Sequence, residues 1–257
     1  MSVLDSIIEG VREDLAMRRL PLAQIREVLE SAPAVRNVGA AFTGPEISII
    51  AEVKRSSPSK GALAPIEDPG ALASRYDESG ANVISVLTER RRFGGSLDDL
   101  DAVRSRVDLP ILRKDFMVDE YQFLEARAHG ADLVLLIVAA LSKNQLDDYY
   151  QLAKELGMSS LIEVHTHDEL ERALEISPEI IGVNSRNLKT LDVDPAAFAQ
   201  LIPRIPVSMV RVAESGISNR SDVEFAQEHG ATAILVGEAL VRSADPELAM
   251  RELRGHR

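Results

Sequence analysis

The sequence predicts an α/β protein, a closed (β/α)8 TIM barrel with an N-terminal helical extension, and two observations support this prediction. Short apolar runs begin near residues 47, 83, 109, 132, 160, 179, 208 and 232, with helix-like segments between them. They recur about every 26 residues, the size of one strand–helix unit, so eight parallel strands are expected. Several runs also end in charged residues, and charged groups at the carboxyl ends of different strands form the active sites of such barrels.

The length of 257 residues is near that of a typical (β/α)8 barrel. We therefore expect a single domain over 1–257, with the helical extension in 1–46 and the barrel in 47–257. The extension begins with one or two amphipathic helices, broken near Pro21, and ends in a connector rich in Gly and Pro. A doubly wound sheet is the structural alternative, but no GxGxxG motif follows any apolar run.

Start and stop signals mark the helices between the apolar runs. Asp68 and Pro69 predict an N-cap followed by proline in the first turn. Three pairs match the capping-box pattern, namely Ser142 with Gln145, Thr166 with Glu169, and Ser221 with Glu224. Four glycines are expected just past helix ends, where a left-handed residue is favoured: Gly80, Gly130, Gly157 and Gly230.

Polar residues at the ends of the predicted strands are the candidate catalytic residues: Glu52, Lys54, Lys114, Glu163, Asn184 and Glu214. Side chains alternate between the two faces of a strand, and this parity directs both lysines and the three glutamates into the barrel. A barrel interior is a packed core, so such charges are tolerated only near its open end. We therefore expect them to meet at one opening, while surface salt bridges at separate strand ends are the alternative.

Three loops predict an anion site. The loop 55–61 combines hydroxyl groups with positive charge, Gly216 follows the seventh apolar run, and Gly237 follows the eighth. Loops after strands seven and eight are the usual phosphate site of this fold. Without a Cβ, backbone N–H groups at these glycines can approach a phosphate closely, although either glycine alone is also typical of a turn. The Glu238 carboxylate is expected to turn away while its N–H points inward.

Composition and charge exclude several classes of function. The formal net charge of −12 argues against nucleic acid and anionic membrane surfaces as partners. The absence of cysteine excludes a disulfide scaffold, a Cys-ligated metal and a cysteine nucleophile. The N-terminal residues lack the apolar stretch of a signal peptide, and no run has the length of a transmembrane helix. We therefore expect a cytoplasmic enzyme that acts on a small molecule.

Histidines and aromatic residues are weaker candidates. Of the histidines, only His165 follows Glu163 with the parity to lie near the open end. The others are expected at helix ends or in the tail: His129, His167, His229 and His256. No His, Asp and Glu spacing matches a metal site, so no metal is expected. Phe93 and Phe116 fit either the cover of an aromatic ring or simple packing of the loops.

Several long segments resemble one known family. They are IIAEVKRSSPSKG, VLTERRRFGGS, PILRKDF, LIEVH, GVNSRNLKTLDVD, VAESGI and ILVGEALV. In order and spacing they resemble the signature segments of indole-3-glycerol phosphate synthase, and the resemblance covers residues 2 to about 255. It implies a (β/α)8 enzyme of tryptophan biosynthesis that uses no cofactor or metal and is a monomer or weak homo-oligomer. Its substrate would be 1-(2-carboxyphenylamino)-1-deoxyribulose 5-phosphate, converted to indole-3-glycerol phosphate with release of CO2 and water.

The resemblance also implies roles for the candidate residues. Lys114 resembles the general acid of ring closure, and Glu163 resembles its partner in dehydration. Lys54 and Asn184 resemble the residues that bind the anthranilate carboxylate and the sugar hydroxyls, and in some schemes for the family the residue that Lys54 resembles shares the acid role. Glu52 and Glu214 resemble supporting carboxylates. The implied phosphate cradle is Ser57, Arg186, Ser215, Gly216, Gly237 and the N–H of Glu238. The implied aromatic pocket is Pro58, Leu87, Phe93, Phe116, Leu135 and Leu188.

One feature departs from some members of that family. They place an aromatic residue early in the N-terminal extension, whereas no aromatic residue precedes Phe42 here, so a lid role for this segment is not implied. Two rival functions remain. Phosphoribosylanthranilate isomerase is a similar barrel enzyme, but it relies on a cysteine, which this chain lacks. A catalytically inactive barrel that serves as a scaffold would be expected to have lost at least one polar strand-end group, and none is lost.

Overall fold

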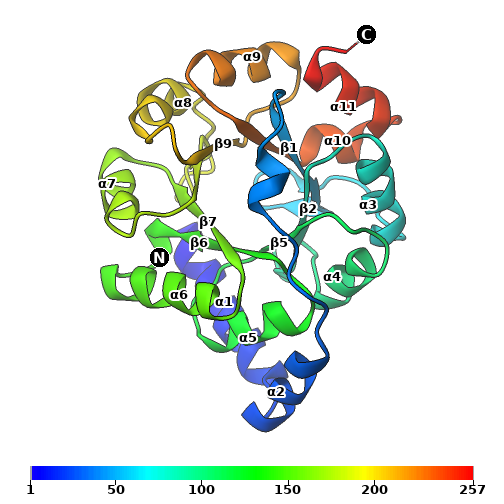
Figure 1. The fold of residues 1–257 in the computed structure, drawn as a ribbon, viewed down its shortest axis with the longest axis vertical. Coiled ribbons are helices and arrows are strands. Elements are labelled where there is room, and N and C mark those ends of the chain that lie inside the picture. The colour runs from blue at the N-terminus through cyan, green and yellow to red at the C-terminus, as the bar shows by residue number, and fades with distance from the viewer. Residues whose placement is uncertain (1, 257) are drawn as a thin grey trace.

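Eight parallel strands close into a barrel in the computed structural model, which describes residues 2–256 (Figure 1). The barrel strands are β1 (Ser48–Val53), β4 (Val83–Leu87), β5 (Ile111–Lys114), β6 (Leu133–Ile137), β7 (Ser159–Val164), β8 (Ile180–Asn184), β9 (Val210–Glu214) and β10 (Ala233–Val236). Because β1 pairs with both β4 and β10, the sheet has no free edge. The predicted (β/α)8 fold is confirmed; Met1 and Arg257 lie outside the described residues.

Helices follow the strands and form an outer ring (Figure 1). They are α3 (Pro69–Glu78), α4 (Leu97–Arg104), α5 (Tyr121–Ala128), α6 (Lys143–Glu155), α7 (His167–Glu175), α8 (Ala196–Leu201), α9 (Arg220–Glu228), α10 (Glu238–Arg242) and α11 (Pro246–Arg254). Shorter elements are the hairpin β2 (Ser56–Ser57) and β3 (Gly61–Ala62), and the 3-10 turns η1 (Gly39–Phe42), η2 (Val138–Ala140) and η3 (Ile202–Arg204). No helix within residues 2–256 combines the length and the apolar character that crossing a membrane requires.

Helix starts agree with the sequence prediction except at two places. The predicted box of Ser142 and Gln145 is present at α6. At α7, Thr166 caps the helix, but the Glu169 carboxylate accepts from the His165 N–H and so does not complete a box. At α9 the predicted box at Ser221 is wrong. Asn219 is the N-cap there, paired with Asp222, since its side chain accepts from the backbone N–H in the first turn.

The core has two layers that alternate along each strand. Ile50, Leu112 and Leu161 point into the barrel and pack with one another, whereas Ile49 and Ile162 point outward against the helices. Both layers are nearly free of solvent. This period-2 pattern is what directs the strand-end residues inward as the sequence predicts. The inward-facing charged residues therefore lie at or near the carboxyl ends of four strands, at Glu52, Lys114, Glu163 and Glu214.

The N-terminal extension covers both ends of the barrel. Helix α1 (Val3–Arg18) places Leu4 and Ile7 in the inner apolar cluster at the carboxyl ends of the strands. Helix α2 (Leu22–Ser31) then packs against α5. The connector continues to the opposite end, where the Ala41 carbonyl accepts hydrogen bonds from Ser48 and Asn82 at the strand starts. The predicted break near Pro21 separates the two helices.

Candidate active site

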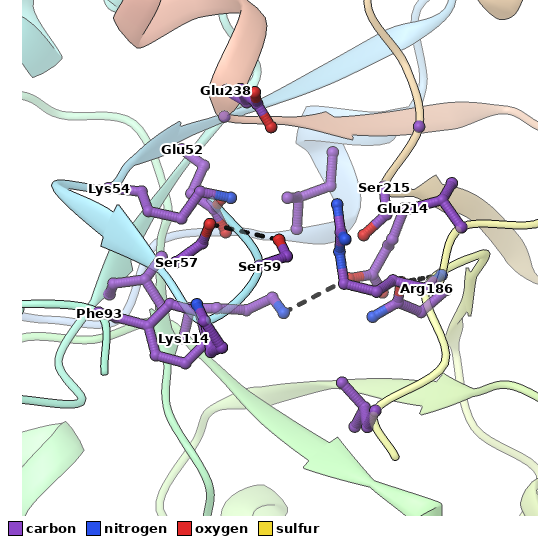
Figure 2. Close-up of a pocket in the computed structure, with 18 of the residues that line it drawn as sticks. Glu52, Lys54, Ser57, Ser59, Phe93, Lys114, Arg186, Glu214, Ser215 and Glu238 are labelled. Atoms are coloured by element: carbon purple, nitrogen blue, oxygen red, sulfur yellow. Dashed lines mark hydrogen bonds and ion pairs between the residues drawn. The ribbon is translucent and has the colours of Figure 1, made fainter. Parts of the chain in front are cut away.

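A cavity of about 590 Å³ opens at the carboxyl ends of the barrel strands (Figure 2). All of the catalytic, phosphate-binding and aromatic-pocket residues named from the sequence line it. Figure 2 shows Glu52 and Lys54 on one side of the cavity and Arg186 and Glu214 on the other. The strand-end side chains thus converge on one space and are not scattered over the surface as separate salt bridges.

Lys114, at the end of β5, lies between two carboxylates. Its Nζ is 3.1 Å from Oε2 of Glu163 on β7 and 3.6 Å from Oε2 of Glu214 on β9. The side chains of both glutamates are at most 2% exposed, and that of Lys114 is 14% exposed. Charges this buried persist only when they are paired, so the three groups form one electrostatic unit.

The protonation states within this unit follow from its charges. Burial lowers the pKa of Lys114, but Glu163, Glu214 and Glu52 outweigh burial and raise this pKa above its usual range. Burial raises the pKa of Glu163, yet the charge of Lys114 and the interaction with His165 together outweigh burial and bring that pKa below the usual range. The pKa of Glu214 is raised, first by burial and then by the charge of Glu163. An ionised Lys114–Glu163 pair therefore lies beside a carboxyl that takes up a proton readily.

Two glycines make room for the buried carboxylates. A Cβ on Gly182, in β8, would overlap the carboxylate of Glu214, and a Cβ on Gly237 would overlap that of Glu52. Neither position needs its glycine for a turn, since neither has a positive φ. The small residue is required by the close approach of a charged side chain.

Gly182→Ala is expected to push the Glu214 carboxylate away from Lys114. We expect a loss of about 1–3 kcal/mol in unfolding free energy from overpacking, together with a reduced kcat. Thermal unfolding and steady-state assays measure both effects. Gly44→Ala is the matched control, because no atom lies within 4 Å of a Cβ built there. Equal behaviour of the two variants would show that Gly182 does not position Glu214.

Lys54 and Glu52 form a second charged pair at the end of β1. Lys54 Nζ lies 2.5 Å from Glu52 Oε2, and the Glu52 side chain is only 4% exposed. Both residues face the cavity because they share the inward face of β1 with Ile50. The strand-end residues therefore bring two ammonium groups and three carboxyl groups to the cavity, as the strand-end pattern predicts.

His165, just after β7, is brought closer to this cluster than the sequence alone indicated. Its Nε2 lies 3.4 Å from Glu163 Oε1, and its Nδ1 lies 3.1 Å from Glu169 Oε2. Its parity after Glu163 is the sequence signal for this placement. The remaining histidines are at helix ends or near the C-terminus, as predicted.

The loops after β1, β8, β9 and β10 contribute the polar wall of the cavity, which consists of Ser57, Arg186, Ser215, Gly216, Gly237 and Glu238. Ser215 and Gly216 both have a positive φ, of 63° and 73°, which turns the chain sharply after β9. The Arg186 guanidinium donates to the Leu191 carbonyl at 2.9 Å. The Glu238 carboxylate lies 3.7 Å from Arg242 on the same helix, α10, and both residues line the cavity.

Another part of the cavity wall is apolar. The rings of Phe93 and Phe116 are 6.1 Å apart between centroids and inclined by 40°. Leu4 and Ile7 of α1 also line the cavity, which the sequence did not predict. Nothing in the sequence pointed to this contact, because the extension has no aromatic residue before Phe42. Aliphatic side chains of α1 line the cavity instead. The N-terminal extension therefore contributes directly to the cavity wall.

Within residues 2–256, no cluster of three or more His, Asp or Glu side chains is arranged to bind a metal ion. The two strand-end lysines of the cavity are paired with carboxylates. The chemistry that this arrangement supports is proton transfer and stabilisation of developing charge.

The closed barrel and the charged cavity at the carboxyl ends of its strands define an enzyme of the (β/α)8 class. A family model described as indole-3-glycerol phosphate synthase matches residues 4–253. The chain belongs to the indole-3-glycerol phosphate synthase family.

Similar proteins agree with this assignment. An indole-3-glycerol phosphate synthase of Micrococcus luteus is 56% identical over 99% of this chain and 97% of its own length. Indole-3-glycerol phosphate synthase 1 of Streptomyces coelicolor is 54% identical over 98% of this chain and 95% of its own. The solved 3-hexulose-6-phosphate synthase of Salmonella typhimurium has a TM-score of 0.65 at 14% identity, covering 81% of this chain and 97% of that one. This last similarity supports the fold alone.

Proposed function

We propose that Lys114 and Glu163 perform the proton transfers of the family reaction in this chain. The enzyme is a carboxy-lyase of tryptophan biosynthesis. It closes the ring of 1-(2-carboxyphenylamino)-1-deoxyribulose 5-phosphate, and loss of CO2 and water then gives indole-3-glycerol phosphate. The observation that supports the two roles is the buried ion pair at 3.1 Å in the cavity.

Lys114 is the general acid of ring closure. The electron-rich aromatic ring attacks the ketone of the ribulose chain, and negative charge develops on the ketone oxygen. An ammonium group beside that oxygen stabilises the charge and supplies the proton. The raised pKa of Lys114 keeps it charged at neutral pH, which suits an acid and not a Schiff-base nucleophile. Decarboxylation restores aromaticity and supplies driving force.

Glu163 serves the dehydration step. Its lowered pKa keeps it ionised at neutral pH, so it is available as a base. Glu214 is the neighbouring carboxyl with a raised pKa, so it can carry a proton where Glu163 cannot. Opposite pKa shifts of two adjacent carboxyl groups are typical of a site in which one group acts as a base and the other as an acid.

Lys54, Glu52 and Asn184 bind and orient the substrate. Lys54 attracts the anthranilate carboxylate, and Glu52 fixes the Lys54 ammonium by their close pairing. The side-chain oxygen of Asn184 accepts from the Arg186 N–H at 2.9 Å, so its NH2 group is left to donate to sugar hydroxyls. The apolar wall around Phe93 and Phe116 receives the aromatic ring, with Leu188 and Pro58 at its rim.

The phosphate lies at the polar wall. The backbone N–H groups of Gly216, Gly237 and Glu238, with the hydroxyls of Ser57 and Ser215, are the proposed donors. Arg186 adds the positive charge, which the acidic chain needs locally to attract an anionic substrate.

Arg186→Ala is expected to weaken the binding of substrate and of inorganic phosphate together. A lost charge-assisted hydrogen bond of about 1.5–3 kcal/mol corresponds to roughly 10- to 100-fold in KM and in the phosphate inhibition constant. Steady-state kinetics with added phosphate measure both constants. Arg251→Ala, an exposed position on α11, is the control. Phosphate inhibition as strong as in the unaltered enzyme would remove Arg186 from the cradle.

The remaining properties are proposals of the same kind. The chain is one domain, with the extension in 1–46 and the barrel in 47–257. It is cytoplasmic, works without cofactor or nucleic acid, and is a monomer or weak homo-oligomer. The assay that tests the activity supplies the carboxyphenylamino substrate and follows indole fluorescence. If no indole product forms, one of the two rival functions is favoured, either the isomerase or the inactive scaffold.

A further inference from the structure

His165 lies between two carboxylates that come from different elements. Glu163 of β7 presents Oε1 at 3.4 Å from its Nε2. Glu169, in the first turn of α7, presents Oε2 at 3.1 Å from its Nδ1, and the same oxygen accepts from the His165 backbone N–H at 2.8 Å. The imidazole is thus fixed on one side by Glu169 and faces the proposed dehydration residue on the other.

This arrangement favours the charged form of the ring. A neutral imidazole has one donor and one acceptor nitrogen, whereas an imidazolium has two donors. Both ring nitrogens face carboxylate oxygens, which only accept when ionised. The pairing geometry is therefore complementary to imidazolium.

Glu163 is in consequence bracketed by two cations. Lys114 Nζ approaches its Oε2 at 3.1 Å, and His165 approaches its Oε1 at 3.4 Å. We propose that His165 is a positioning residue, whose imidazolium fixes the Glu163 carboxylate so that one oxygen stays directed at Lys114 and the substrate. This rests on the proposed role of Glu163 in dehydration.

His165 acts through Glu163 and not on the substrate. It is absent from the residues that line the cavity, and its side chain is 9% exposed. The groups that face Glu163 are Lys114 on β5, Glu214 on β9 and His165. The groups that face His165 are Glu163 and Glu169. Burial lowers the pKa of His165, but the interactions with the Glu163 and Glu169 carboxylates outweigh burial and raise the pKa to about 10.

The kinetic test compares His165→Ala with His165→Gln, whose amide keeps a donor without charge. For His165→Ala we expect kcat to fall about tenfold or more with little change in KM. A general acid–base group contributes roughly 10²–10⁴ to the rate, and loss of His165 removes the part of this contribution that depends on how Glu163 is positioned. Loss of the cation also raises the pKa of Glu163, so the acid limb of the kcat profile moves to higher pH. His165→Gln is expected to recover part of kcat but to retain the shifted limb.

His167→Ala is the matched control. It removes a histidine two positions further on, whose side chain is 42% exposed and pairs with Glu171 outside the cavity. Its kcat and acid limb are expected to match those of the unaltered enzyme. A His165→Ala variant that behaves like His167→Ala would overturn the proposal.

A second measurement is independent of turnover. NMR of the imidazole nitrogens in the full chain reports the charge of each of the five histidines, and His165→Gln identifies the relevant signal. We expect His165 to remain imidazolium at pH 8, and a neutral ring at that pH overturns the proposal. An active Glu163→Gln enzyme would instead refute the proposed role of Glu163, and the charge of His165 separates these two failures.

Discussion

Lys114→Ala is expected to abolish turnover, with kcat reduced by about 10⁴-fold or more. General acid catalysis contributes roughly 10²–10⁴, and loss of the charge that stabilises the developing oxyanion adds to it. We do not expect Lys54 to replace the lost group, because Glu52 holds the Lys54 ammonium at the end of β1, whereas the Lys114 ammonium lies beside Glu163 and Glu214. Indole fluorescence under saturating substrate measures the effect.

The same variant must be shown to remain folded. Without Lys114, the buried Glu214 lacks its counter-ion and Glu163 keeps only His165, so the pKa values of both carboxyl groups rise, and that of Glu214 lies further above its value in the unfolded chain. Carboxyl groups with raised folded pKa values bind more protons in the native state, so the stability of the variant falls as pH rises through the carboxyl range. We therefore expect thermal unfolding closer to that of the unaltered enzyme at pH 6 than at pH 8. Activity is compared at pH 6.

Lys143→Ala is the control for charge removal alone, since that side chain is 73% exposed at the start of α6. It is expected to leave kcat unchanged. Near-normal kcat in Lys114→Ala, with the fold intact, would refute the assignment of Lys114 as the acid.

Glu163→Gln is expected to lower kcat by about 10³-fold with little change in KM. The amide keeps the size and one acceptor oxygen, but it neither accepts a proton as a base nor balances the charge of Lys114. An effect on kcat with KM unchanged identifies an interaction made in the transition state. A change confined to KM would place Glu163 among the binding residues instead.

Glu171→Gln is the matched control for this substitution. Its side chain lies on α7, is 69% exposed and pairs with His167. We expect wild-type kinetics, because surface ion pairs of this kind contribute at most about 1 kcal/mol.

The fold and most of the site could be predicted because strand parity is a local property. Glu52 and Lys54 share a face with Ile50 in the sequence, and the structure places all three inward. Glu163 follows Leu161 by the same rule. Once a barrel is inferred, the carboxyl ends of its strands must meet, so the convergence of these side chains follows from topology.

Other features depend on contacts between distant segments and have no local signal. Leu4 and Ile7 reach the cavity because α1 packs across the open end of the barrel. The cap of α9 at Asn219 was missed because two capping-box patterns overlap there, and only the geometry selects between them. The position of His165 beside Glu163 likewise has no local signal, because it depends on the Glu169 side chain, which turns back from α7 and accepts from the His165 N–H.

A single-turnover experiment with Glu163→Gln tests the division of labour between Lys114 and Glu163 most directly. An excess of enzyme is mixed with substrate, and CO2 release and indole fluorescence are followed in the same reaction. Ring closure and decarboxylation precede dehydration, so we predict CO2 release at a rate near that of the unaltered enzyme, with indole formation delayed by orders of magnitude. Equal loss of both signals would contradict the account, because it would place Glu163 in ring closure beside Lys114.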